Sequence, residues 1–397
     1  MKKYIILTLT AMAALAACSK MEVAPEAQRE INFEVANSVR TKATGSVYNN
    51  GAFGTYAWFN NTDVFMTNEQ VNLAAGVWKT IDHTFYWPKS GSISFISYSP
   101  FAGTSNTAGT VPTITKNSIT YGNPTATPAT GITIGGTDLM YADRATCSAN
   151  VNEVTDSDTA DSGYKGVPTV FHHALAKLSF KMKANFVTYV DATTNTRTSW
   201  DVTVTSAKIS GFKNTGDCAL TLNADGKTWD KPVTNIGTAA DPVNVNVWTN
   251  VSGATAEQQL IDATTYPEGV KFYYDAANDK EYNDALDLSA ASGFVMPQAL
   301  IAGTGAQKLE LTIHIKTHLS NGKTIDEDFV RTVDIKDISS LKAWEMNQNI
   351  VYTIKIKPTA KADGAEGHDD DPNDVIITFD PAVSDWTTVD ASATIQL

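Results

Sequence analysis

Histidine and aspartate are the side chains in this sequence that metal binding or proton transfer would need. The groups that bring them together are His172–His173, His314 with His318, Asp156 with Asp158 and Asp161, and the run from His368 to Asp371. Adjacent strand residues face opposite sides, so the first pair cannot easily hold one ion. The second pair has no cysteine or carboxylate at a useful spacing, and neither aspartate group matches an EF-hand loop. We predict core-and-rim histidines, solvated acidic loops and no metal site; calcium at the acidic loops is the alternative.

Motifs of the common enzyme classes are absent from the sequence. It contains no G-x-S-x-G, H-E-x-x-H, P-loop or G-x-G-x-x-G in a strand-to-helix context. The net charge of −13 opposes binding to nucleic-acid phosphates and to anionic lipid heads. We therefore predict that the protein is not an enzyme, needs no cofactor and binds no nucleic acid. A hydrolase is a distant alternative, which would require clustered carboxylates in a cleft.

The N-terminus presents one cysteine with a specific chemistry. Two lysines precede an apolar run that ends in Leu15-Ala16-Ala17-Cys18. This order is that of an export signal, and the apolar run is too short to span a membrane as a mature helix. The ending resembles a bacterial lipobox, which implies cleavage before Cys18 and acylation of its thiol. We predict a signal peptide over 1–17, a tether over 18–30 and membrane contact only through the lipid; an incidental cysteine after an ordinary signal peptide is the alternative.

The two remaining cysteines, Cys147 and Cys218, lie far apart in the sequence. An exported pair of cysteines can form a disulfide. Two buried free thiols fit the sequence equally well, because unpaired cysteine packs as a small hydrophobic residue. The sequence leaves both states open.

Short β-strands account for the N-terminal half of the chain. A length of 397 residues predicts two domains, and a composition with 18% charged residues suits exposed β-structure. Ile31, Phe33 and Val35 alternate as a first strand, followed by a polar, basic loop that contains Arg40. Short apolar segments at a spacing of about ten residues then indicate a β-sandwich over 31–167, with its aromatic residues in the core.

The stretch 171–182 is predicted to begin a second domain over 168–397. Its second half alternates between apolar residues and lysine or serine, the pattern of a half-buried antiparallel strand. The alternation that includes Val204 later slips by one residue, which predicts a β-bulge near Ser206. Two further alternating runs flank Asn321-Gly322, which predicts a hairpin.

Four features, in this order, resemble the fimbrillin-like (type V) pilins and related fimbrial lipoproteins of anaerobic Gram-negative bacteria. They are the lipobox at Cys18, the motif 171–178 with the strand pair 204–222, the run 344–349 leading into 352–356, and 376–379 followed by 383–386. Each feature alone is weak, but the ordered set spans almost the whole chain. The resemblance implies an all-β fold of two transthyretin-like antiparallel β-sandwich domains in tandem.

The resemblance also implies a route of assembly. Such a pilin reaches the outer membrane as a lipoprotein, where a trypsin-like protease cuts after an arginine in the loop that follows the first strand. Loss of that strand opens a hydrophobic groove, which a C-terminal segment of a neighbouring subunit fills. This is β-augmentation, in which main-chain ladder bonds are combined with alternate side chains in pockets.

This sequence has candidate residues for each step of that route. The apolar residues of the removable strand are Ile31, Phe33 and Val35. The cut falls at Arg40–Thr41, with Lys42 as an alternative, whereas a cut at Arg29 would leave the strand attached. The candidate donor residues of the tail over 375–397 are Ile377, Phe379, Val383 and Trp386. The opposing possibility is that Arg40 is an ordinary surface residue and the strand stays in place, as an anchor or tip subunit would require.

Two functions follow from these features. The first is a structural or adhesive fimbrial subunit, a surface-exposed lipoprotein of the outer membrane that enters the fimbrium after processing. Its partners would be other fimbrial subunits, the maturation protease and a host or bacterial surface ligand. The alternative is a surface glycan-binding lipoprotein, which buried tryptophans would exclude. Its sugar platform would be Trp58, Trp78, Trp87 and Trp248.

Overall fold

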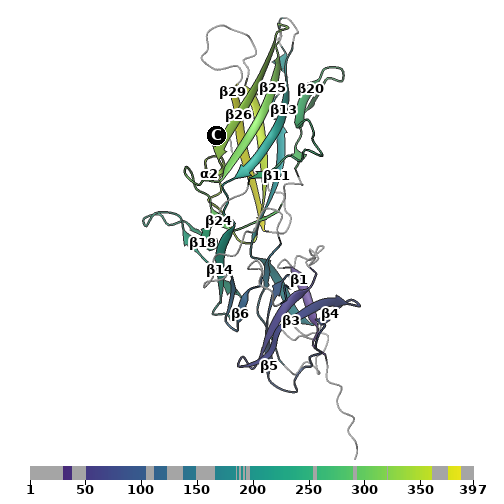
Figure 1. The fold of residues 1–397 in the computed structure, drawn as a ribbon, viewed down its shortest axis with the longest axis vertical. Helices are drawn as coiled ribbons and strands as arrows, with labels where there is room; N and C mark the ends of the chain where they lie inside the picture. The colour runs from purple at the N-terminus through teal and green to yellow at the C-terminus, as the bar shows by residue number, and fades with distance from the viewer. Residues whose placement is uncertain are drawn as a thin grey trace, which may run out of the picture.

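The chain is drawn out along one axis, with a sheet at one end, a sandwich at the other and a smaller sheet between them (Figure 1). The computed structural model describes residues 30–37, 51–103, 111–122, 137–148, 166–184, 186, 189–190, 193, 197–253, 257–288, 293–319, 321–359 and 374–385. Nearly all of their regular structure is β-strand, which confirms the all-β prediction. Within these ranges no helix is both long and apolar enough to cross a membrane.

The N-terminal sheet closes on itself. Its strands are β1 (Phe33–Asn37), β2 (Phe53–Phe59), β3 (Asp63–Ala74), β4 (Val77–Thr80), β5 (Ser92–Ser99), β8 (Met140–Ala142), β9 (Ala145–Ser148) and β10 (Val167–His173). They follow the order β2-β3-β4-β1-β10-β8-β5-β9, and β2 also pairs with β5, which completes a ring. Within the ring only β1 and β10 pair in parallel. One apolar face of these strands therefore encloses a single core, which we call the N-terminal core.

The opposite face of β2, β5 and β8 packs against a middle sheet. This sheet consists of β6 (Thr113–Thr115), β7 (Ser118–Tyr121), β14 (Thr215–Leu222), β15 (Trp229–Asp230) and β18 (Thr249–Ser252). Cys218 pairs with Tyr121, so strands from both halves of the chain meet here. Their apolar side chains form the middle core, which includes Trp58, Ile96 and Trp248.

The C-terminal sandwich packs two sheets around the largest core of the molecule. One sheet contains β11 (Ala176–Ala184), β22 (Leu286–Asp287), β23 (Gly293–Val295), β28 (Gln348–Thr359) and β29 (Asp374–Asp385). The other contains β12 (Tyr189–Val190), β13 (Arg197–Ser210), β19 (Gln258–Gln259), β20 (Val270–Asp275), β21 (Lys280–Tyr282), β25 (Lys308–His318) and β26 (Thr324–Asp334). Alternation along β11 and β25 buries every second side chain, because a pleated strand turns successive side chains to opposite faces.

Two local predictions for this sandwich are confirmed. The ladder between β13 and β25 shifts register between Val204 and Ser206, at the predicted bulge. Asn321-Gly322 connects β25 to β26, which pair along their whole length, and Gly322 has the positive φ of 81° that a tight turn needs. The only described helix, α2, spans Ile335–Ile338. The remaining strands form two short pairs, β16 (Thr234–Asn235) with β17 (Asn244–Val245), and β24 (Gln298–Ala299) with β27 (Ala343–Trp344).

The stretch predicted as one strand over 171–182 is two strands in two different sheets. β10 belongs to the N-terminal ring and β11 to the C-terminal sandwich, so the chain changes sheet at Ala174–Leu175. The Ala174 amide donates to the Leu139 carbonyl at 2.7 Å, and the Asn347 amide donates to the Leu175 carbonyl at 3.0 Å. These bonds to loops take the place of a ladder at the break. β11 pairs antiparallel with β22 and β23, as predicted, but its longest ladder, with β28, is parallel.

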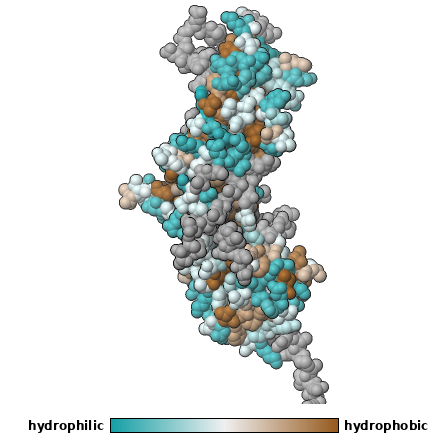
Figure 2. Space-filling view, in the orientation of Figure 1, coloured by the Kyte–Doolittle hydropathy of each residue, from teal (hydrophilic) through white to brown (hydrophobic). Residues whose placement is uncertain are grey.

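Hydrophobic residues on the face seen in Figure 2 form separate spots among hydrophilic ones. The most exposed large apolar side chains of the described residues are Val64, Val330, Leu73 and Val233, at 66%, 62%, 57% and 57%. Scattered apolar residues of this kind are normal for a folded surface.

Both described cysteines are free thiols. Cys147 lies in the N-terminal core and Cys218 in the middle core, and both are fully buried. Burial raises the pKa of the Cys218 thiol, since the thiolate would be left without water. This arrangement decides the open question from the sequence in favour of two buried thiols.

Candidate functional site: the seat of the first strand

Strand β1 is one of the strands of the N-terminal ring, between β10 and β4. We call its position there, against these two strands and the N-terminal core, the seat of β1. It pairs with β10 along its whole length, from Phe33 opposite Val167 to Asn37 opposite Phe171. The Val167 amide also donates to the Asn32 carbonyl at 2.7 Å, which extends the contact beyond the strand. The predicted strand over 31–35 is therefore present, shifted by two residues toward the C-terminus.

The side chains of β1 fill the N-terminal core. Ile31 and Phe33 are 1% and 3% exposed, and Val35 packs against the same core while partly buried. The ring of Phe33 meets the rings of Phe53 and Phe95 edge-on, with centroids 5.6 and 5.8 Å apart. Edge-to-face contacts of this kind add to the free energy of burying an aromatic ring. The structure thus brings all three predicted strand residues together in one core.

β1 forms far fewer ladder pairs with β4 than with β10. Phe33 opposite Trp78 is the one ladder pair that joins the two strands. The β3–β4 hairpin turns at Ala75 and Gly76, both with positive φ, immediately before β4 begins. Because β1 and β4 run antiparallel, the residues of β1 that follow Phe33 extend toward this turn and form no further ladder pair with β4. Before Phe33, the Ile31 amide donates to the carbonyl of Phe85 at 2.9 Å.

Gly166 lets β10 approach β1 closely. Its φ is +124°, and a Cβ at this position would lie 2.6 Å from the carbonyl carbon of Phe33 and 2.7 Å from the Glu34 nitrogen. Both atoms belong to the backbone of β1 and cannot turn away. Only glycine therefore permits the observed seat of β1 against β10.

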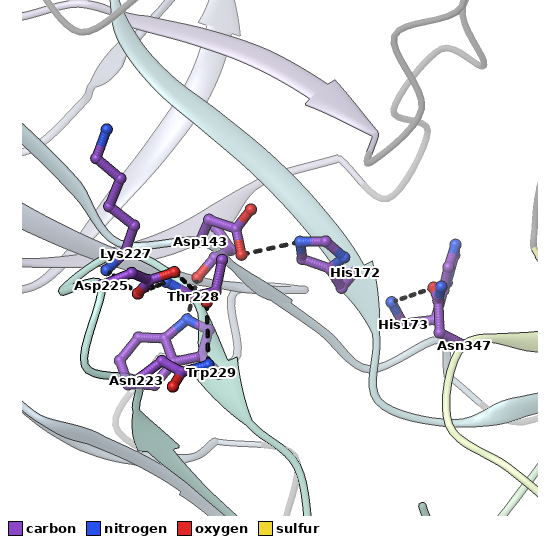
Figure 3. A network of polar contacts seen from close by, with 10 residues as sticks. Asp143, His172, His173, Asn223, Asp225, Lys227, Thr228, Trp229 and Asn347 are labelled. Carbon is purple, nitrogen blue, oxygen red and sulfur yellow. Dashed lines mark hydrogen bonds and ion pairs between the residues drawn. The ribbon is translucent and has the colours of Figure 1, made fainter.

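β10 is fixed on its other side, away from β1 (Figure 3). His172 Nε2 lies 2.9 Å from the carboxylate of Asp143, and the His173 amide donates to the side chain of Asn347 at 3.2 Å. The Asp143 amide donates to the Val170 carbonyl at 3.0 Å. These contacts join β10 to the turn between β8 and β9 and to the residue that precedes β28, and none of them involves β1. We infer that β10 keeps its place when β1 is absent.

Several predicted site residues lie outside the residues that the structure describes. They are Cys18, Arg40, Thr41, Trp386 and the acidic loops 155–166 and 368–371, apart from Gly166. β1 ends at Asn37, so the predicted cut at Arg40 comes shortly after the strand in the chain. Both the lipid attachment and the cut therefore stay predictions.

The predicted donor strand lies in the C-terminal sandwich. β29 pairs antiparallel with β28 over its full twelve residues, with Ile377 opposite Ile356, Phe379 opposite Ile354 and Val383 opposite Ile350. β29 is the edge strand of its sheet. The structure does not bring these residues to the seat of β1, which lies in a different sheet of the same chain.

Each described histidine has a carboxylate partner, which the sequence analysis missed. His173 Nδ1 lies 2.9 Å from Asp138, and His172 and His173 are respectively partly exposed and buried, as opposite strand faces predict. The other pairs are His83 with Glu69, His314 with Asp326 and Asp328, and His318 with Asp201. The hydrogen bond that the Glu69 carboxylate accepts from the His83 ring, together with the carboxylate charge, raises the pKa of His83. Each partner lies at least ten residues away in the sequence, on another strand or loop, so sequence spacing could not reveal it.

Each of these histidines lies beside one or two carboxylates. Among the described residues, no three His, Cys, Asp or Glu side chains are placed to hold a metal ion. A carboxylate lies beside each of these rings, at the surface or in the core.

The tryptophan platform of the glycan-binding alternative is wrong. Trp58, Trp87 and Trp248 are 8%, 4% and 3% exposed, and Trp78 packs against the N-terminal core. The indole nitrogen of Trp248 donates to the Ala174 carbonyl at 2.8 Å inside the molecule. Three of the four tryptophans fill cores and the fourth is partly buried, so together they form no exposed row on which a sugar could stack.

The fold is that of a large all-β protein with a ring, a middle sheet and a sandwich. The family model for fimbrillin-like proteins matches residues 41–386, and the chain belongs to this family. No curated protein matches the chain. It is similar to a fimbrial protein from Bacteroides vulgatus, at 17% identity over 90% of this chain and 100% of that chain, with a TM-score of 0.48. It is also similar to the fimbrial anchor protein Mfa2 from Porphyromonas gingivalis, at 10% identity over 90% and 98% of the two chains, with a TM-score of 0.28.

Proposed function

We propose that this member of the fimbrillin-like family is a structural or adhesive fimbrial subunit that assembles by exchanging its first strand. It is exported as a lipoprotein through Cys18 and reaches the surface of the outer membrane. A trypsin-like protease cuts after Arg40 and releases β1. A C-terminal strand of a neighbouring subunit then enters the ring in place of β1, and the subunit becomes part of the fimbrium.

The seat of β1 is the observation that carries this proposal. Ile31 and Phe33 are almost completely buried, and burial of each such side chain stabilises a protein by about 1.5–3 kcal/mol. A ring without β1 exposes that apolar surface together with the unpaired edge of β10. An incoming strand with a similar alternation of apolar and polar residues buries that surface again and pairs with the edge of β10. The free energy gained in this way drives assembly.

The order of the chain makes removal of β1 possible. β1 precedes every other described strand and is joined to β2 only through residues 38–52, which contain Arg40. One cut there separates β1 from the rest without threading any segment through the ring. The weak ladder to β4 leaves side-chain burial and the β10 ladder as the main forces that retain the cut strand.

The proposal is tested with purified mature chain and a trypsin-like protease that accepts only arginine. We expect the cut protein to form oligomers on size-exclusion chromatography with light scattering, while the uncut protein remains monomeric. The variant Arg40→Gln should stay monomeric after protease treatment. The matched control Arg29→Gln should assemble like the natural chain, because Arg29 precedes the strand. Cut protein that has lost β1, keeps its tail and never assembles would contradict the proposal.

A further inference from the structure

Arg144 is the only lysine, arginine, aspartate or glutamate among the described residues that is buried, with 8% of its surface exposed. It lies at the break between β8 and β9, which both pair antiparallel with β5. Between the ladder pairs on either side of this break, three residues of the β8–β9 stretch lie opposite two residues of β5. The extra residue makes a β-bulge, which redirects a side chain from the regular alternation of a strand.

The guanidinium of Arg144 contacts neutral oxygens on the face of the ring that is opposite the N-terminal core. Its Nη2 donates to Asn61 Oδ1 at 2.6 Å and to Ser94 Oγ at 2.9 Å. Ser94 is on that face because its neighbour Phe95 faces the N-terminal core. The other N–H donors, on Nε and Nη1, have no acceptor among the described residues, and Nε is completely buried.

No carboxylate of the described residues forms an ion pair with Arg144. Burial lowers the pKa of the Arg144 guanidinium, because the charged form loses water and gains no opposite charge in return. Buried charges in proteins are as a rule paired and hydrogen-bonded, since an unpaired one is costly. The charge of Arg144 therefore calls for an anion from outside the described part of the chain.

The side chains around Arg144 add further donors near the surface. Because arginine only donates, the Asn61 atom that faces it is the oxygen, and the amide nitrogen of Asn61 has no acceptor among the described residues. Lys116 Nζ lies 3.4 Å from the carbonyl oxygen of Asn61. Both residues are exposed, as is Thr146, whose hydroxyl oxygen lies 3.0 Å from that of Ser94. The buried guanidinium thus lies directly beneath a surface that offers donors.

These donors come from two sheets. Asn61 is in the turn between β2 and β3 of the ring, and Lys116 is in the turn between β6 and β7 of the middle sheet. The Arg144 amide donates to the Lys227 carbonyl at 2.9 Å, in the turn between β14 and β15. A ligand at Arg144 would therefore contact the ring and the middle sheet together.

We propose that Arg144, Lys116 and Asn61 bind an oxyanion, the carboxylate or sulfate group of an acidic ligand, at this junction. The guanidinium and the ammonium supply positive charge, and Arg144 Nη1 and the Asn61 amide supply hydrogen bonds. Charge-assisted hydrogen bonds from arginine to such oxygens are among the strongest in proteins. The net charge of −13 repels anions from the chain as a whole, so binding depends on these local donors. None of the three residues belongs to β1, and the inference is independent of strand exchange.

Isothermal titration calorimetry of the uncut mature chain with sodium sulfate tests the inference, with chloride added to keep the ionic strength constant. We expect Arg144→Gln to weaken sulfate binding by roughly tenfold or more, because it removes a buried charged donor. The exposed change Lys116→Gln leaves the fold intact and should weaken binding by roughly threefold or more. Lys323→Gln is the matched control, since it removes the same charge from another exposed turn. Equal affinity of Lys116→Gln and the natural chain would overturn the inference.

Acetate and glucuronate, titrated in the same way, distinguish a free anion from an acidic group carried by a sugar. Tighter binding of glucuronate than of acetate, with the same loss in Lys116→Gln, would support a site that also contacts the sugar ring. Equal binding of the two would support a site that recognises the oxyanion alone. If none of the three anions binds to the natural chain, the inference is wrong.

Discussion

The two ends of the molecule hold their strands in different ways. In the C-terminal sandwich, β25 has a full ladder on both sides, with β13 and with β26. In the N-terminal ring, β1 has a full ladder with β10 but a single paired residue with β4. Yet Phe33 is as deeply buried as the inward side chains of β25. β1 is therefore retained mainly by its side chains and one ladder, and β25 by two ladders and its side chains.

Under the proposed strand exchange, this difference distinguishes a strand that stays in the fold from one that is replaced. A strand with two ladders cannot leave without exposing two rows of main-chain groups, whereas β1 exposes only one full row. The side chains of β1 can be replaced by others of similar shape, because hydrophobic burial depends on area and fit and not on direction. We therefore expect changes at β1 to affect the ring and to leave the sandwich intact.

Of the changes considered, removal of β1 should lower the stability of the N-terminal ring the most. Deleting residues 30–37 removes the burial of Ile31 and Phe33, about 1.5–3 kcal/mol each, together with the β10 ladder. Because a folded domain is stable by only about 5–15 kcal/mol, we expect the N-terminal melting transition to fall sharply or disappear. Differential scanning calorimetry should show the sandwich transition unchanged. A single transition shifted for the whole molecule would contradict the independence of the two ends.

Truncation of Phe33, the aromatic side chain of β1, should have the second-largest effect on the stability of the ring. Phe33→Ala removes a buried ring that contacts Phe53 and Phe95, which costs about 3–5 kcal/mol. Chemical denaturation followed by tryptophan fluorescence measures this loss in the N-terminal transition. Leu73→Ala is the control, because Leu73 is 57% exposed and its truncation should change stability by less than about 0.5 kcal/mol.

A methyl group on Gly166 should loosen β1 without touching its side chains. The added Cβ would meet the backbone of Phe33 at 2.6 Å and would have to adopt a positive φ, at a combined cost of about 1–3 kcal/mol. Gly103→Ala is the control, because Gly103 also has positive φ but nothing within 4 Å of its Cβ. We expect the cut Gly166→Ala protein to release β1 faster than the cut control, as measured by mass spectrometry of the released peptide. Equal release rates would show that close approach to β10 does not hold the strand.

The alkylation rates of the two buried thiols should reveal the smallest effect, a local increase in solvent access when β1 leaves the ring. Cys147 shares the N-terminal core with Phe33, whereas Cys218 lies in the middle core. After the Arg40 cut and loss of β1 we expect alkylation of Cys147 to accelerate at least tenfold. Cys218 should stay unreactive, because its burial is unchanged and its raised pKa keeps the thiolate scarce. Peptide mapping distinguishes the two sites, and equal acceleration at both would indicate unfolding beyond the ring.

Sequence pattern predicted the features of this fold that depend on neighbouring residues. Alternation predicted β11 and the two strands beside Asn321-Gly322, the slip near Ser206 predicted the bulge, and Asn321-Gly322 predicted the hairpin. The ring could not be predicted from the sequence, because the parallel pairing of Phe33 with Val167 joins residues that are far apart in the chain. The break at Ala174–Leu175 was hidden because both residues are buried and apolar, and so look like a continuation of the strand.

The candidate site was predictable in part for the same reason. Ile31, Phe33 and Val35 form a local pattern, and their shared apolar face was evident. Their partners in the N-terminal core come from strands throughout the first half of the chain, and Gly166 has no sequence signal beyond being a glycine. The place of β29 in the sandwich follows from its pairing with β28, which alternation alone could not distinguish from pairing with another subunit.

Mass spectrometry of the protein taken from the surface of the cells that make it, with sequencing of its N-terminus, tests the central claim most directly. The account predicts assembled chains that begin at Thr41 and contain no residue of β1. Assembled chains that begin at an acylated Cys18 and retain Ile31, Phe33 and Val35 would contradict strand removal.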